Sequence, residues 1–171
     1  RLNTDGSLDT TFKAPIFAQP FFSLVLQADN KMVVVTYEDY NTTIFRLNAN
    51  GSVDSSFDTV KTNGVCDIEE QGTKYIISGY FDAVNGFSRR YIARINKNGG
   101  VDDSFKPSYN WSFVGGSINN SIIQPDGKII AVGYFVDGPG NFVKVFRLNP
   151  DGDLDSSFKG GDDFAEMFPV S

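Results

Sequence analysis

The chain has 171 residues, 40% of them hydrophobic, and its 21 acidic and 15 basic residues give a net charge of -6. An acidic chain repels phosphate groups, so we expect neither nucleic acid nor an anionic membrane surface as a partner, and no apolar run approaches the roughly 20 residues that membrane insertion needs. The single cysteine, Cys66, excludes an internal disulfide, and the lack of histidine excludes Ser-His-Asp and Cys-His catalysis and the usual zinc sites.

The chain begins with a twelve-residue motif, RLNTDGSLDTTF, which recurs at 46–57, 94–105 and 147–158. The starts of consecutive copies are separated by 45, 48 and 53 residues. Repetition at this period indicates a row of similar small units, so we treat residues 1–171 as one repeat array. Since the chain starts inside a motif, we expect it to be part of a longer protein. The expected units are 1–45, 46–93, 94–146 and a partial unit, 147–171.

A second recurring element lies between the motifs and first occurs as LVLQADNKMVVVTYE at 24–38. It combines a short apolar strand, a tight Asp-Asn or Asp-Gly turn and a longer strand opened by lysine. These features predict a β-hairpin, because Asn and Gly accept the positive φ of such turns. The element recurs at 121–135, and a looser copy at 66–81 has a turn, Gln71-Gly72-Thr73, that we expect to be one residue longer.

The motif itself predicts a second hairpin in each unit. β-branched and aromatic residues precede an Asn-x-Asp/Asn-Gly turn, and a short Leu/Val-Asp-x-Ser/Thr-Phe segment returns. No stretch has the apolar spacing of a helix, and four antiparallel strands in about 45 residues is the size of one β-propeller blade. We therefore predict an all-β fold: a β-propeller-like array of four-stranded antiparallel blades that forms part of a larger propeller. About three to four blades lie in this chain, with the motif phenylalanines packed between them.

The two elements together, RLN-x-DG-x-LD-x-SF and the hairpin with QPDGKI at its turn, resemble the delta-60 repeat. This is a β-propeller repeat of large bacterial surface or secreted proteins and of some phage virion proteins. The resemblance extends over nearly the whole chain. It implies a propeller-like array in an extracellular or cell-surface protein, with the virion as the alternative location, and it brings no catalytic residues to transfer.

The motif also resembles the calcium loop of some propellers, D-x-D/N-x-D-G-x-x-D, whose side-chain oxygens converge on one cation. Arginine occupies the first position in every copy, and a guanidinium there supplies the positive charge that the cation would bring. We therefore predict no cofactor and metal-free turns held by Arg-Asp ion pairs. The alternative, a weak cation site, is restricted to Asp151, Asp153 and Asp155 of the last copy. The predicted ion pairs are Arg1 with Asp9, Arg46 with Asp54, Arg94 with Asp102, and Arg147 with Asp155.

Strand order places the repeated turns on one rim of the array and the non-repeating segments on the other. These segments contain aromatic residues among Asn, Ser, Gly and Asp, a combination that suits saccharide or protein surfaces. We predict binding residues there, with packing between blades as the alternative role of each ring. The segments are 13–22, 38–42, 58–64, 82–90, 106–117, 136–142 and the tail from residue 159. The candidate ligand-binding residues are Tyr109, Trp111, Phe113, Tyr40 and Phe87.

The first functional hypothesis is a non-catalytic module of a bacterial cell-surface or secreted protein that mediates adhesion or binding to a glycan or a protein. The second is a structural component of a phage particle or another large extracellular assembly. A polysaccharide-active enzyme is the third, with acids such as Glu38, Asp39, Asp82 and Asp137 as a candidate pair. Sequence spacing does not establish two carboxylates across a cleft, and solvated loop carboxylates are far commoner, so we predict no enzymatic activity. The expected partners are a protein or glycan surface and further blades of the same longer chain or a larger assembly.

Overall fold

The computed structural model describes residues 1–15, 20–38, 41–107, 115–137 and 140–159. The regular secondary structure in these ranges consists of β-strands, which confirms the all-β prediction. The same ranges contain no helix long and apolar enough to cross a membrane. The strands are β1 (Phe21–Leu26), β2 (Met32–Glu38), β3 (Asn41–Leu47), β4 (Val60–Thr62), β5 (Val65–Gln71), β6 (Lys74–Gly79), β7 (Ala83–Val84), β8 (Phe87–Ser88), β9 (Ile92–Asn96), β10 (Gly115–Ile123), β11 (Ile129–Asp137) and β12 (Gly140–Leu148).

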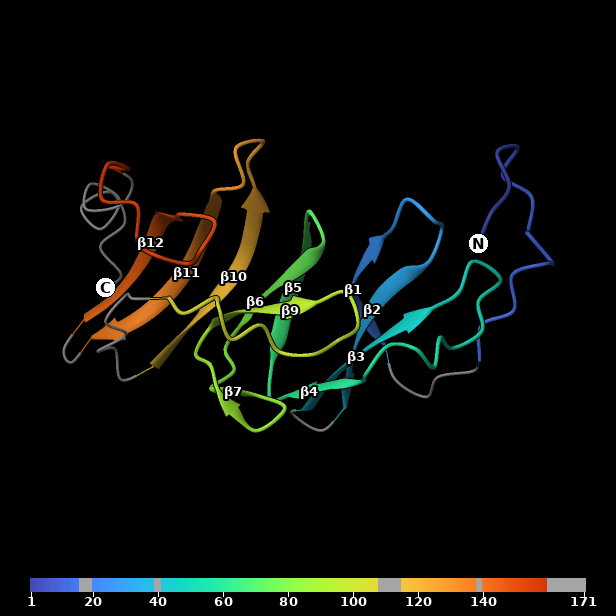
Figure 1. The fold of residues 1–171 in the computed structure, drawn as a ribbon, viewed down its shortest axis with the longest axis horizontal. Helices are drawn as coiled ribbons and strands as arrows, with labels where there is room; N and C mark the ends of the chain where they lie inside the picture. The colour runs from blue at the N-terminus through green and yellow to red at the C-terminus, as the bar shows by residue number, and fades with distance from the viewer. Residues whose placement is uncertain (16–19, 39–40, 108–114, 138–139, 160–171) are drawn as a thin grey trace.

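The described strands form three antiparallel sheets that follow one another along the long axis of the molecule (Figure 1). Each sheet contains a hairpin and the strand that leads into the next motif. We call these groups blade 1 (β1, β2, β3), blade 2 (β5, β6, β9) and blade 3 (β10, β11, β12). The short strands β4, β7 and β8 extend the sheet of blade 1 beyond β3. A hairpin that lies between two strands of blade 2 in the sequence is therefore paired with the sheet of blade 1.

The fourth strand that we predicted for each blade is reduced to one residue pair. Asp54 N–H donates to the carbonyl of Arg46 at 2.8 Å, and Phe57 N–H then donates to the carbonyl of Asp54 at 3.2 Å. This tight turn bends the chain out of the sheet before a strand can extend. The isolated bridges are Leu2 with Leu8, Leu47 with Val53, Ile95 with Val101, and Leu148 with Leu154.

The β5–β6 turn is one residue shorter than the β1–β2 turn, so the prediction of a longer turn is wrong. Gln71 pairs with Lys74, which leaves a two-residue turn. In the β1–β2 hairpin, Gln27 N–H donates to the carbonyl of Lys31 at 2.8 Å, across three intervening residues. Gly72 has a φ of +58°, the left-handed conformation that two-residue hairpin turns require.

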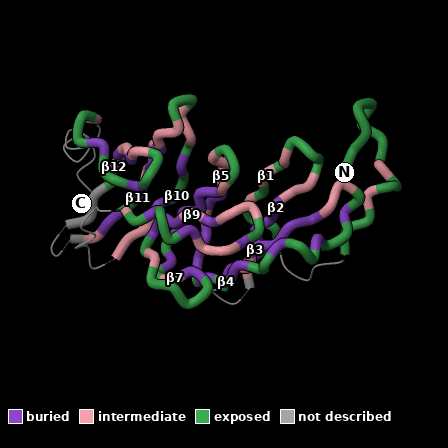
Figure 2. Tube along the Cα trace, in the orientation of Figure 1, coloured by how far each residue is buried: buried purple, intermediate pink, exposed green. Residues whose placement is uncertain are grey.

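Apolar cores fill the spaces between consecutive blades. Alternate residues of one strand face opposite cores: Ile77 belongs to the core shared with blade 1, and Ile76 to the core shared with blade 3. The motif residues Phe57 and Phe105 lie in these two cores, 5% and 0% exposed, which confirms their predicted place between blades. Figure 2 shows the buried segments within the array and the exposed segments at the tips of the turns.

The turns lie on two opposite rims of the array, as the strand order predicts. The β1–β2, β5–β6 and β10–β11 hairpin turns lie on the rim that is uppermost in Figure 1. An ion pair joins a motif turn to this rim, since Lys31 Nζ at the end of the β1–β2 turn lies 2.8 Å from Oδ2 of Asp54 in the following motif. Strand β4 and the β7–β8 hairpin lie at the opposite edge. We call the first edge the repeated rim and the second the variable rim.

Candidate functional site

On the repeated rim, every motif contains an ion pair between its arginine and its aspartate. Each arginine donates from Nε to Oδ2 of the aspartate eight residues later. The donor–acceptor distances are 2.5 Å for Arg1 and Asp9, 2.8 Å for Arg46 and Asp54, 2.6 Å for Arg94 and Asp102, and 2.8 Å for Arg147 and Asp155. The repeated turns are therefore closed by side-chain charges that come from the motif itself.

The motif aspartates receive further donors, which occupy both carboxylate oxygens. Oδ1 of Asp54 accepts the backbone N–H of Ser56 at 3.0 Å and its hydroxyl at 2.7 Å, while Oδ2 also accepts from Lys31. The hydrogen bonds from Lys31 and then Ser56 hold the pKa of Asp54 well below its usual range. In the first copy, hydrogen bonds from Thr11 and Arg1 lower the pKa of Asp9 to about 2.

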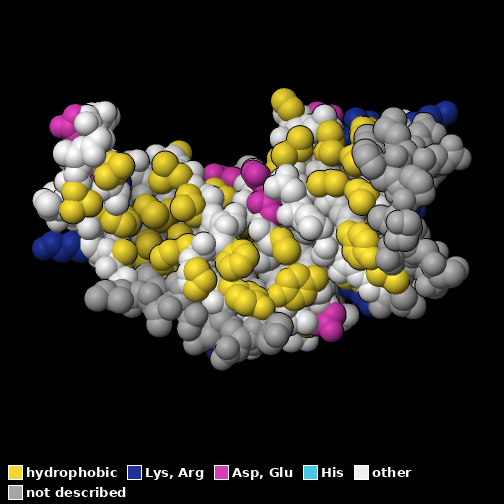
Figure 3. Space-filling model, turned by 180° about the vertical axis from the view of Figure 1, so that it is seen from behind, with side chains coloured by type: hydrophobic (Ala, Val, Ile, Leu, Met, Phe, Trp, Pro, Cys, Tyr) yellow, Lys and Arg dark blue, Asp and Glu magenta, His cyan; other side chains and the backbone are white. Residues whose placement is uncertain are grey.

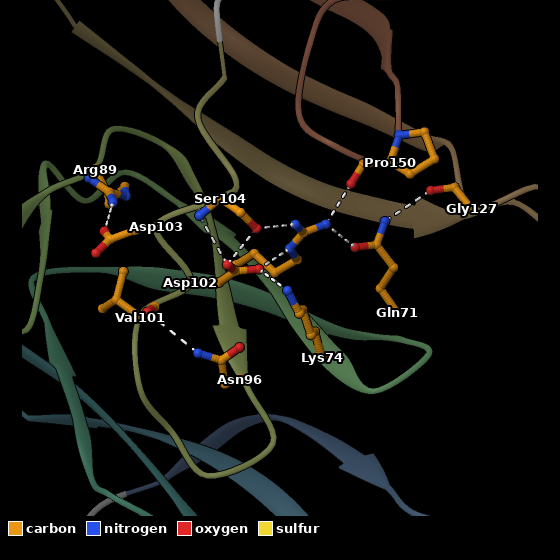
Figure 4. A network of polar contacts seen from close by, with 11 residues as sticks. Gln71, Lys74, Arg89, Asn96, Val101, Asp102, Asp103, Ser104, Gly127 and Pro150 are labelled. Atoms are coloured by element: carbon orange, nitrogen blue, oxygen red, sulfur yellow. Dashed lines mark hydrogen bonds and ion pairs between the residues drawn. The ribbon is translucent and has the colours of Figure 1, made fainter.

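The motif arginines also connect one motif to the next. Nη1 of Arg46 donates to the carbonyl of Lys97 at 2.8 Å, and Nη1 of Arg94 donates to the carbonyl of Pro150 at 2.5 Å. Each of these guanidinium groups also lies over the phenylalanine of its own motif, with Cζ of Arg46 at 5.2 Å from the ring centroid of Phe57. Figure 4 shows this network: Lys74 and Ser104 donate to Asp102, and the carbonyl of Pro150 accepts from the guanidinium of Arg94. The repeated motif therefore acts as a clamp between neighbouring blades.

The alternative cation site in the last motif is not assembled. Oδ1 of Asp151 accepts the backbone N–H of Asp153 at 3.1 Å, and Asp155 is paired with Lys128 and Arg147. Across the described residues, no group of three or more acidic, cysteine or histidine side chains is placed to hold a metal ion.

The variable rim contains a polar groove with a volume of about 580 Å³. Three of the predicted non-repeating segments, 38–42, 58–64 and 82–90, contribute to its walls. The lining residues are Asn41, Thr42, Thr43, Lys61, Thr62, Asn63, Asp82, Ala83 and Gly86. Segments that are far apart in the repeat pattern thus meet at one hollow.

The β7–β8 hairpin closes one side of this groove. Asn85 and Gly86 form its turn with φ values of 49° and 81°, the left-handed pair typical of a type I′ turn. Hydrogen bonds fix the hairpin to β4: Asn85 N–H donates to the carbonyl of Lys61 at 2.8 Å, and Lys61 N–H donates to Oδ1 of Asn85 at 2.7 Å. Asp82 N–H donates to Oδ1 of Asn63 at 3.2 Å. The groove therefore has a fixed wall built from two segments of the second repeat unit.

Two buried threonine hydroxyls of the groove form hydrogen bonds within the chain, whereas two charged side chains have no partner among the described residues. The buried hydroxyls of Thr42 and Thr62 accept backbone N–H groups, at 3.0 Å from Val65 and 3.4 Å from Gly64. In contrast, the exposed side chains of Lys61 and Asp82 have no partner within the described part of the chain. They offer one cationic donor and one anionic acceptor to a ligand.

The predicted aromatic residues are only partly described. Phe87 lies on β8 directly after Gly86 of the groove, and 51% of its side chain is exposed. Tyr40, Tyr109, Trp111 and Phe113 lie outside the described residues and stay predictions. The sequence reasoning missed Lys61 of the groove and named Asp82 only as a candidate catalytic acid, although the Asn85-Gly86 pair between short apolar runs was a signal for the hairpin that positions them.

In a comparison with known protein families, the repeated segments of the chain match a family model. A family model described as a domain of unknown function (DUF5122) beta-propeller matches residues 1–12, 27–57, 74–105 and 124–158. The matched segments contain all four motif copies and the longer hairpin strands that lead into them. No curated protein and no solved structure matches the chain.

Proposed function

Because the chain belongs to this β-propeller family, whose model matches more than half of its residues, we propose that it is a non-catalytic binding module. In this proposal it is part of a bacterial cell-surface or secreted protein and binds a glycan or a protein surface through the variable rim. The repeated rim clamps the blades together, and the non-repeating segments hold the ligand, as is common for loops on a rigid scaffold.

The groove of about 580 Å³ is the observation that carries the proposal. Its size falls within the range of small-molecule and oligosaccharide sites. Hydroxyl and amide groups from Thr43 and Asn63 stand beside the charged side chains of Lys61 and Asp82, and the exposed ring of Phe87 follows the groove wall. The polar groups can fix the orientation of a bound sugar, and the aromatic ring can cover its apolar face. This combination favours a glycan over a protein surface.

Absence of catalysis is part of the proposal. Glycoside hydrolysis typically needs two carboxyl groups about 5–10 Å apart, one on each side of the bond. Among the described lining residues of the groove, Asp82 is the only acid. A glycan held there meets one carboxylate that can orient it by hydrogen bonding.

The direct test is a glycan array followed by calorimetry on the strongest hit. We expect Phe87→Ala to weaken binding about tenfold, by analogy with nucleobase stacking on aromatic side chains, which contributes on the order of 1–3 kcal/mol per base. Asp82→Asn should also weaken binding, and Asp153→Asn is its control because Asp153 is an exposed acid on the repeated rim. A hit whose affinity is unchanged by Phe87→Ala and Asp82→Asn would place binding elsewhere and contradict the proposal.

A second candidate function, a structural part of a phage particle or another large assembly, is favoured by the apolar faces at both ends of the array. Leu24 of β1 and Ile122 of β10 are 58% and 52% exposed. Ile68, which occupies the place of Leu24 in blade 2, is 2% exposed because it packs between blades. Figure 3 shows hydrophobic side chains spread over much of one face of the array, its N-terminal part included. If the chain binds no glycan on the array and assembles in a concentration-dependent way in analytical ultracentrifugation, these results would favour this function.

A further inference from the structure

The contact between consecutive motifs has the same geometry at each junction. Nη1 of the motif arginine donates to the carbonyl of the fourth residue of the following motif. The donor–acceptor distances are 2.9 Å for Arg1 and Ala49, 2.8 Å for Arg46 and Lys97, and 2.5 Å for Arg94 and Pro150. One repeated hydrogen bond therefore joins each motif to the next along the array.

The two ends of the array contain the two halves of one further junction. Arg147 of the last motif pairs with Asp155 and lies over the ring of Phe158, but its Nη1 donates to no carbonyl among the described residues. The carbonyl of Thr4, the fourth residue of the first motif, accepts no hydrogen bond within the same part of the chain. The last motif thus has the donor of the junction, and the first motif has its acceptor.

The motif glycines show the same difference between the first copy and the later ones. A Cβ built on Gly51 would lie 2.7 Å from the backbone nitrogen of Ala14, which follows the first motif, and one on Gly152 would lie 3.0 Å from the ring of Phe105 in the third motif. A Cβ on Gly6 would meet no atom within 4 Å. The surface of a motif that packs against a preceding motif is therefore open on the first copy.

Apolar side chains are exposed at both ends of the array. Leu24 is more than half exposed, whereas Ile68, its counterpart in blade 2, is buried in the core shared with blade 1. Ile122 is also more than half exposed, whereas Val25, its counterpart in blade 1, packs against the core shared with blade 2. The exposed side chains thus occupy positions that the array covers wherever two blades meet.

The two ends, which lie at opposite ends of the long axis (Figure 1), are complementary in hydrogen bonding and in apolar surface. We infer that the array associates head to tail with a second copy of this chain. Arg147 of one copy donates to the carbonyl of Thr4 in the next, and the surfaces around Ile122 and Leu24 are buried together. Contact between two different faces builds a ring or a filament. The inference goes beyond glycan binding at the variable rim and gives the second candidate function its partner.

The experiment is analytical ultracentrifugation of the chain over a range of concentrations, with one variant for each end. The wild-type chain should associate as concentration rises. Leu24→Asp and Ile122→Asp each place a charge on one face at an exposed position, so each should stay folded and monomeric when alone. An equimolar mixture of the two should form a complex of two chains, because the intact Ile122 face of one meets the intact Leu24 face of the other.

Two matched controls separate the ends from the rest of the surface. Val53→Asp should associate like the wild type, because Val53 is 48% exposed but belongs to the second motif, within the array. Gly6→Asn should weaken association about tenfold, because its side chain fills the open surface of the first motif, and asparagine tolerates the positive φ there. Gly72→Asn, at an equally open glycine with positive φ in blade 2, should leave association unchanged.

Three results would overturn the inference. A wild-type chain that stays monomeric at every concentration would mean that further blades, and not a second copy, cover these faces. Association of either aspartate variant alone would show contact between like faces or through another surface. Loss of association in Val53→Asp, or none in Gly6→Asn, would also place the contact elsewhere. Each of these results leaves the proposed glycan binding standing, since the array of glycans tests the variable rim separately.

Discussion

The two rims of the array use similar polar residues in different ways. On the repeated rim, Asp102 accepts hydrogen bonds from Arg94, Lys74 and Ser104, so neither of its oxygens is left for a ligand. On the variable rim, the side chains of Lys61 and Asp82 face a groove without a partner among the described residues. Regularity along the sequence therefore marks the groups that hold the fold, and irregularity marks the groups that remain available for binding.

The largest effect is expected from removal of a clamp on the repeated rim. Arg94→Ala should lower the free energy of unfolding by about 3 kcal/mol, because it leaves the buried carboxylate of Asp102 with fewer donors and breaks the link to Pro150. Arg1→Ala is the control: the Arg1 side chain is 41% exposed, so its loss should cost about 1 kcal/mol or less. Urea denaturation measures both, and equal losses would contradict the clamp.

Acid should weaken the repeated rim, because its aspartates are held in the charged form by their donors. The motif aspartates have pKa values lowered by their donors, to about 2 for Asp9 and below the usual range for Asp54. An unfolded aspartate titrates near 3.9, so this stability is fully present above about pH 5 and is lost as pH falls toward the lowered pKa. Glu69 acts in the opposite sense, because burial and the charge of Asp67 raise its pKa.

The acid effect is measured as the melting temperature between pH 7 and pH 2. A constant value down to about pH 5, followed by a steady fall, is the expected profile. The variant Asp54→Asn should melt lower at pH 7 and show a shallower fall. A melting temperature that rises on acidification would mean that Glu69 outweighs the motif aspartates.

Two glycines provide a matched comparison of the rims. Gly86 in the β7–β8 turn and Gly72 in the β5–β6 turn both have positive φ, at 81° and 58°, and an added Cβ would meet no atom within 4 Å at either position. Each Gly→Ala variant should therefore lose about 1 kcal/mol from backbone strain alone. We expect only Gly86→Ala to weaken ligand binding, since its hairpin forms the groove wall. Calorimetry on both variants checks this, and equal losses of affinity would remove the distinction between the rims.

The smallest effects are expected from single lysines. Lys74→Ala should cost about 1 kcal/mol, because Lys74 Nζ lies 2.5 Å from Oδ2 of Asp102 at a site that is only partly exposed. Lys61→Ala should change stability by less than about 0.5 kcal/mol, as is usual for a surface residue without partners. Urea denaturation distinguishes them, and a larger loss for Lys61→Ala would show that the groove contributes to the scaffold.

The blades could be predicted from the sequence because their determinants are local. The Asn-x-Asp/Asn-Gly turn fixes one hairpin, and the eight-residue spacing of Arg46 and Asp54 places both on one turn. The fourth strand was predicted too long because the hydrogen bond from Phe57 N–H to Asp54 bends the chain away, a detail that strand propensity does not contain. Local sequence patterns thus predict which strands and turns form, but they do not predict the residue at which a strand ends.

The groove could not be predicted because it depends on pairing between strands that are distant in the chain, beginning with Thr42 of β3 and Thr62 of β4. Thr62 of β4 pairs with Val84 of β7, and this places Asp82 beside Asn63, about 20 residues earlier in the chain. The Asn85-Gly86 turn was visible in the sequence, but nothing local says that its hairpin joins the sheet of the preceding blade.

The division between a structural rim and a binding rim is tested most directly by hydrogen exchange with and without the best glycan from the array. The account predicts slower exchange in residues 41–43, 61–63 and 82–90, and unchanged exchange in the repeated turns at 48–52 and 149–153. Protection of the repeated turns, with the groove segments unchanged, would contradict it.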